Sequence, residues 1–108
     1  MKIIDLHNEK NQVTNIRLIE TNKALLSVNE KFKTVFFKFE EGKGLPNHSH
    51  NGEASIYIFS GRVYIEFLTG EKFELKTGDF LPFDARIEHN VIALEESKVI
   101  VTIGQASR

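Results

Sequence analysis

Turn-forming residues interrupt this sequence at short intervals, which restricts the chain to short extended segments. Turns rich in glycine, asparagine or aspartate recur roughly every 8–12 residues, for example at Gly61, Gly70 and Gly78. Between two of them, Lys72–Lys76 (KFELK) alternates strictly between charged and apolar residues. Other segments rich in β-branched and aromatic residues, each predicted as a strand, lie at residues 33–39, 54–60, 63–68, 80–83, 88–94 and 98–103.

The part of the chain before residue 33 carries shorter apolar runs, around Ile16 and Leu18 and again at residues 25–28, which we also assign to β-structure. No segment keeps a period of about 3.6 residues over three helical turns, so helix is a minor component. About ten short strands separated by regular turns predict an all-β fold, an antiparallel β-sandwich or small barrel.

Composition narrows the possible functions mainly by exclusion. The 108 residues are enough for one domain with a single core, and the formal charge of −1 gives no attraction to nucleic acid or to an anionic membrane. Cysteine is absent, which excludes disulfides, thiolate metal sites and cysteine nucleophiles. There is no membrane-spanning apolar run, and the start MKIIDLHNEK lacks the apolar core of a signal peptide, so we expect a cytoplasmic protein.

The residues best suited to chemistry are histidines. His48 and His50 are two positions apart, so in an extended segment both imidazoles project to the same side. Continuing that alternation places Ala54, Ile56 and Ile58 on the inner side, and His89 shares its phase with apolar neighbours two and four positions later. Three imidazoles facing one space could form a facial metal site with positions open for substrate or water.

The spacing of these residues resembles the two motifs of the cupin superfamily. In the first motif, Gly42 is followed after five residues by His48-Ser49-His50, and Gly61 closes the motif. In the second, Gly78 and His89 have the expected separation. The resemblance covers about residues 33–103 and implies a conserved-barrel (jelly-roll) cupin, with residues 1–32 as an N-terminal extension and first strands and residues 1–108 as a single domain. It also implies a homodimer, as do aromatic residues on both faces of the predicted strands.

Three positions depart from the family motifs. Ala54 stands where the family has its metal-binding glutamate, Asp84 and Arg86 replace a proline and a glycine, and Ala93 replaces an asparagine. The resemblance therefore implies a site of three ligands, His48, His50 and His89. The adjacent Glu53 points away by strand alternation unless a bulge turns it, so it could be a fourth ligand, a hydrogen-bond partner of a ligand or a solvated charge.

The cofactor predicted from this ligand set is a divalent metal ion, and three imidazoles suit Fe, Zn, Ni, Cu or Mn, although some small cupins have lost their metal. Such a site keeps the full charge of the ion and favours a small anionic organic ligand. Candidate ligand-binding residues are Arg86 at the barrel rim and Ile56 and Ile58 in the lining. His7 has no partner in the sequence and is expected at the surface or as a weak ligand.

Two functions remain open from the sequence. One is a metal-dependent oxygenase or isomerase acting on a small organic acid or carbonyl compound. The other is a non-catalytic module that binds or senses a small molecule or a metal. We expect neither nucleic acid nor a membrane as a partner, since the charge and hydropathy patterns offer no surface for either.

Overall fold

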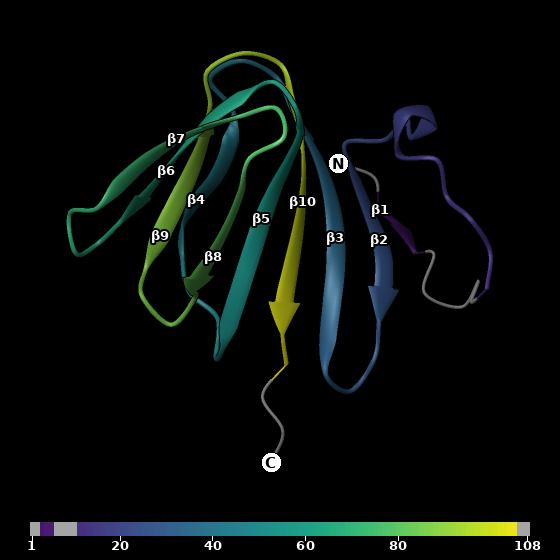
Figure 1. Ribbon diagram of the computed structural model, residues 1–108, viewed down its shortest axis with the longest axis horizontal. Coiled ribbons are helices and arrows are strands. Elements are labelled where there is room, and N and C mark those ends of the chain that lie inside the picture. The colour runs from purple at the N-terminus through teal and green to yellow at the C-terminus, as the bar shows by residue number, and fades with distance from the viewer. Residues whose placement is uncertain (1–2, 6–10, 106–108) are drawn as a thin grey trace.

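Two β-sheets packed face to face make up the protein in a computed structural model, which describes residues 3–5 and 11–105 (Figure 1). Every strand pairing is antiparallel except that of β1 with β2. The all-β antiparallel sandwich predicted from the sequence is therefore confirmed. No helix within the described residues is both long and apolar enough to cross a membrane.

The larger sheet has six strands in the order β1-β2-β3-β10-β5-β8, and the smaller has four in the order β4-β9-β6-β7. The larger sheet comprises β1 (Ile3–Asp5), β2 (Lys23–Val28), β3 (Phe32–Phe39), β5 (Glu53–Ser60), β8 (Phe80–Asp84) and β10 (Ser97–Gly104). The smaller sheet comprises β4 (Gly44–His48), β6 (Arg62–Phe67), β7 (Lys72–Lys76) and β9 (His89–Ala93).

Most strands begin and end within one residue of the predicted bounds, and β7 coincides with the predicted Lys72–Lys76 segment. The prediction of β-structure around Ile16 and Leu18 was wrong, because these residues form the 3-10 helix η1 (Ile16–Leu18). The Asn15 side chain caps this turn by accepting a hydrogen bond from the Arg17 backbone N–H at 3.0 Å. A capping asparagine directly before the apolar residues is a local helix signal that outweighed the apolar pattern.

The core lies between the two sheets and is built by strict alternation. In β5, Ala54, Ile56 and Ile58 are buried while Glu53 and Tyr57 are exposed, as the sequence phase predicted. The main inward-facing side chains come from both sheets: Val35, Phe37, Phe39, Ile56, Ile58, Val63, Ile65, Phe67, Leu75, Val91, Val99, Val101 and Ile103. Such interdigitation of two inner faces is what fixes the sheet spacing in a sandwich.

A second buried layer covers part of the outer face of the larger sheet. Ala24 and Phe36 are opposite each other on β2 and β3 and are both fully buried, although their neighbours in each strand face the other way. Ala24 shares a surface hollow with Val13, Leu18 and Ile19 from the segment that contains η1. The segment before β2 therefore packs on the sheet rather than extending away from it.

Backbone contact between β4 and β9 is close because of one glycine. A Cβ atom at Gly44 would lie 1.9 Å from the carbonyl oxygen of Val91, so no larger residue fits without moving a strand. Strand β4 lies at the edge of the smaller sheet and ends in His48. Gly44 thus allows this edge strand to pair with the strand that carries His89.

Candidate functional site

Three histidines from separate parts of the chain meet at one end of the sandwich. His48 ends β4 and is the direct cross-strand partner of His89, which begins β9. His50 lies two residues beyond β4, where its backbone N–H donates a hydrogen bond to the carbonyl of Ala85 at 2.8 Å. The ring centroids are 4.4 Å apart for His48 and His89, 5.1 Å for His48 and His50, and 6.5 Å for His50 and His89.

The sequence pattern treated the segment from His48 to Ile58 as one extended strand, but in the structure it forms two. A bend at residues 49–52 separates β4 from β5, and the two strands belong to opposite sheets. His48 lies in the smaller sheet and His50 in the segment after it, and both line the interior cavity, while Ala54, Ile56 and Ile58 face the interior from the larger sheet. The alternation predicted the correct side for each residue, but not the crossing between sheets.

Backbone carbonyl groups fix the orientation of two of the rings. The Nδ1 atom of His48 lies 2.7 Å from the carbonyl oxygen of Pro46, and that of His89 lies 2.8 Å from the carbonyl oxygen of Ile87. A carbonyl oxygen only accepts, so each Nδ1 carries the proton and donates it. The lone pair is then left on Nε2, which is the arrangement found in histidines that ligate metals.

Burial lowers the pKa of two of the imidazoles. His89 is only 3% exposed, and burial lowers its pKa despite the opposing effect of its hydrogen bond to Ile87. The pKa of His50 is lowered first by burial and then by the charges of His48, Lys33 and His89. Neutral imidazoles are the form that binds a metal ion, so less competition from protons is expected near neutral pH.

The ring positions fit a shared metal ion for two of the three pairs. A metal–nitrogen distance of about 2.1 Å puts each ring centroid about 3.2 Å from the ion, so adjacent ligand rings lie about 4.5–5.2 Å apart in a tetrahedral or octahedral site, and opposite ligands of an octahedron about 6.4 Å apart. The distances from His48 to each partner fall near the range for adjacent ligands, while 6.5 Å between His50 and His89 exceeds it. Accordingly, no three potential ligands within the described residues already have the geometry of a formed metal site. The donor set fits, and His50 is the one of the three that lies outside any strand.

Aromatic side chains surround the buried face of His89. Phe83 and Phe67 have ring centroids 5.0 and 5.7 Å from the imidazole, and they are 5.5 Å from each other. These contacts exclude water from one side of the ring, which accounts for the burial that lowers the pKa of His89. Phe67 and Phe83 thus have a direct role in shaping the site.

A cavity of about 490 Å³ adjoins the histidines between the inner face of the larger sheet and β4. Its volume is in the range of small-molecule sites. The lining residues are Lys23, Leu25, Lys33, Val35, Phe37, Leu45, Pro46, His48, His50, Val101 and Ile103. Two of the three histidines therefore face a largely apolar space with two cations in its wall.

Glu53, considered as a fourth ligand, is exposed at the start of β5 and lines a different hollow together with Thr34 and Thr102 on the outer face of the sheet. The buried Ala54 takes the inward position. A role for Glu53 as ligand or as hydrogen-bond partner of a ligand stays a prediction, and its position offers it no support.

The predicted ligand-binding residues also lie outside the lining of the cavity. The Arg86 guanidinium pairs with Asp84 in its own turn, with Nε 2.8 Å from Oδ1, and holds the pKa of that carboxyl below its usual value. Ile56 and Ile58 are 1% and 0% exposed and belong to the core. Their roles in ligand binding stay predictions, and His7 lies outside the described residues.

The sequence reasoning overlooked the two cavity lysines, although a signal was present. Lys33 shares its alternation phase with Val35, Phe37 and Phe39, all of which face the core. A lysine in phase with buried residues is therefore predicted to point inward. Lys23 had no comparable signal, because its side of the strand depends on pairing with Phe37 across the sheet.

Comparison with known proteins agrees with this architecture. The family model for the cupin domain matches residues 35–103. A conserved protein of unknown function from Streptococcus pyogenes is similar with a TM-score of 0.79 and 21% identity, over 100% of this chain and 98% of that one.

Two further solved structures are more similar in sequence. An RmlC-like cupin from Desulfovibrio desulfuricans has a TM-score of 0.73 and 29% identity, with 86% of this chain and 97% of that chain covered. KdgF from a Halomonas species has a TM-score of 0.69 and 26% identity, with 79% and 78% covered. The search of curated proteins gives no match.

Proposed function

Because this chain belongs to the cupin domain family, we propose that it binds a divalent metal ion through His48, His50 and His89 and a small anionic organic ligand in the adjoining cavity. One observation carries the proposal. The imidazoles of His48 and His89 are cross-strand neighbours, and each donates its Nδ1 proton to a carbonyl two residues earlier. Two Nε2 lone pairs are thereby held ready, with His50 beside them on a bend.

Different residues would have different roles in such a site. His48 and His89 are fixed by the sheet and by their carbonyl partners, while Phe67 and Phe83 keep water from the buried side. Apolar side chains of the cavity would hold the body of the ligand next to the imidazoles. A bound metal ion would supply Lewis acidity at its open positions, which suits the polarisation of an oxygen atom of the ligand. An oxygenase or isomerase is the enzyme class that this arrangement supports.

A specific observation favours the second candidate, a non-catalytic module that binds or senses a small molecule or metal. The residues that line the cavity include no aspartate or glutamate among the described part of the chain, and Glu53 faces the outside. Without a carboxylate, the cavity lacks a strong general base, since the imidazoles would be engaged with the metal. Binding without turnover needs no such group.

Metal titration tests the proposal directly. Purified without a histidine tag and treated with a chelator, the protein is titrated with Zn²⁺, Ni²⁺ and, without oxygen, Fe²⁺ in a calorimeter. We expect one site per chain, and we expect His89→Gln or His48→Ala to weaken binding by at least about tenfold, because each removes one ligand. His7→Gln, which changes a histidine outside the proposed set, is the matched control and should bind as the parent does.

The two candidate functions differ in the fate of an added acid once the metal is bound. Incubating the metal-loaded protein with a panel of small hydroxy and keto acids, with and without oxygen, should consume one of them if the protein is an enzyme. Binding of an acid without its consumption would favour the non-catalytic module. Absence of stoichiometric binding for all three metals would overturn the proposed metal site itself.

A further inference from the structure

Two lysines line the cavity. Both lie on the inner face of the larger sheet, where most other side chains are apolar. Lys33 on β3 lines it together with Val35 and Phe37 of the same strand, and Lys23 on β2 is the cross-strand partner of Phe37. Neither lysine takes part in an ion pair among the described residues. A half-buried ammonium beside apolar side chains is costly unless it meets water or an anion.

The two lysines differ in what surrounds them. The ammonium of Lys23 lies over the ring of Phe37, 5.4 Å from its centroid, and so already has a favourable cation–π contact. Lys33 has no such aromatic contact among the described residues. Lys33 lines the same cavity as His48 and His50, and it lies four residues along β3 from Phe37, over which Lys23 lies. Lys33 is thus the cation at the histidine end of the cavity.

A row of paired residues across the larger sheet connects Lys33 on β3 to the surroundings of His89. Lys33 is paired with Ile103, Ile103 with Ala54, and Ala54 with Phe83, whose ring contacts His89. Ala54 is the inward position of this row and contributes only a methyl group. This row beside the histidines therefore carries a positive charge and no carboxylate.

The dimensions of the cavity restrict the ligand further. Lys33 and Phe37 are four residues apart on β3, so the floor between them extends for about 13 Å at about 3.3 Å per residue. The side chains over this length are aliphatic, from Leu25, Val35, Val101 and Ile103. At the far end the ammonium of Lys23 already contacts the ring of Phe37, so the Lys33 end with the apolar walls beyond it matches a molecule with one acidic end and an apolar body.

We infer that the cavity takes an amphipathic monocarboxylic acid, with its carboxylate paired to Lys33 beside His50 and its apolar body lying toward Phe37. The inference rests on the proposed function for the location of the site, and it adds the class of ligand and the residue that selects it. Lys33 is then a specificity-determining residue, which favours acids over neutral compounds of the same shape.

Nuclear magnetic resonance titration of the metal-free protein tests the inference, with hexanoate and hexanamide as matched probes. We expect amide signals along β3 and β10 to shift with hexanoate and hexanamide to bind about fivefold or more weakly, because it lacks the charge. Lys33→Gln should remove this preference. Lys38→Gln, a lysine on the outer side of the same strand, is the matched control and should change hexanoate affinity by less than about twofold.

Equal affinity for hexanoate and hexanamide would overturn the inference, and so would an equal loss of hexanoate affinity in both lysine variants. Zn²⁺ titration of the same variants keeps the two proposals separate. If Lys33→Gln still binds metal but no longer prefers the acid, the result supports both the metal site and the ligand class. Metal binding without any preference for acid contradicts the ligand class alone, and hexanoate binding without metal binding contradicts the metal site alone.

Discussion

His89 shows how a single residue acquires its properties from its surroundings. It begins β9, is almost fully buried against Phe67 and Phe83, and donates Nδ1–H to the carbonyl of Ile87. Burial lowers its pKa from the ordinary value of 6.5. In the unfolded chain the same imidazole takes up a proton near its ordinary pKa, so the two states differ in bound protons below that pH.

This difference predicts a pH dependence of stability for the metal-free protein. Below about pH 6.5 the unfolded state binds more protons, so the free energy of unfolding should fall as the pH is lowered toward the folded-state pKa. Urea unfolding in the presence of a chelator between pH 7.5 and 5 measures the slope. His89→Gln should reduce this slope. A slope that is the same in the parent and in His89→Gln would contradict the role of burial.

The bend between His48 and β5 is the element that decides the geometry of the site. The rings of His48 and His89 are held by cross-strand pairing, whereas His50 is outside any strand. Its ring is 6.5 Å from that of His89, longer than the spacing of adjacent ligands on one ion. The position of the third ligand therefore depends on residues 49–52, while β4 and β9 hold the other two.

The pairing of β4 with β9 depends on Gly44, and this gives a prediction at the level of the strand. Gly44→Ala would push a methyl group against the carbonyl of Val91, so we expect the free energy of unfolding to fall by about 2–4 kcal/mol and metal affinity to fall with it. Lys43→Ala, an exposed neighbour, should change stability by less than about 0.5 kcal/mol. Denaturant unfolding of both variants checks this, and an unaffected Gly44→Ala would show that β4 is free to shift.

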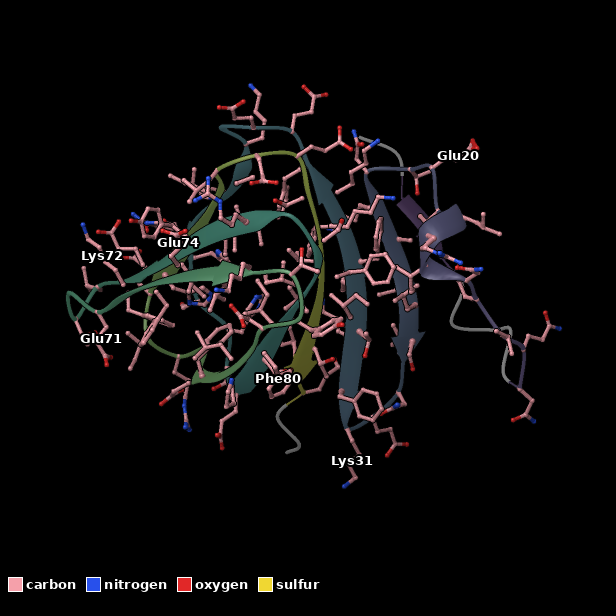
Figure 2. The ribbon with its side chains drawn as sticks, turned by 45° about the horizontal axis from the view of Figure 1, so that its top comes forward. Glu20, Lys31, Glu71, Lys72, Glu74 and Phe80 are labelled. Atoms are coloured by element: carbon pink, nitrogen blue, oxygen red, sulfur yellow. The ribbon has the colours of Figure 1, made fainter. Side chains whose placement is uncertain are left out.

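At the scale of the whole molecule, the outer face of the larger sheet leaves an apolar row exposed. Ile100, Tyr57 and Phe80 lie side by side on β10, β5 and β8, and Tyr57 and Phe80 are 36% and 61% exposed. Phe80 is labelled in Figure 2, on the strand at the edge of this sheet. Contiguous exposed aromatic residues often mark an interface, and a two-fold pair of identical faces is the commonest arrangement.

The homodimer expected from the sequence remains a prediction, and this row is the surface that we propose for it. Light scattering across micromolar concentrations should give twice the mass of the chain. Phe80→Ser should shift the equilibrium toward the monomer, whereas Leu68→Ser, which changes a still more exposed apolar residue in the turn after β6, should not. A monomer for the parent protein throughout this range would contradict the prediction.

The sequence by itself determined the strands, the side to which most residues point, and the family. Alternation over two residues is a local property of extended backbone, so the buried positions of β5 and β9 and the three histidines could be predicted without a fold. The η1 turn was missed because a single capping residue, Asn15, outweighed the apolar pattern.

Only the tertiary structure decided which of these residues share a space. It separated Glu53, Arg86 and Ile56 from the cavity and brought Lys23 and Lys33 into it. The physical reason is that the register between strands and the crossing from one sheet to the other depend on packing between residues far apart in sequence. A local pattern gives each side chain a side of its strand, but the neighbours that it meets there depend on the whole fold.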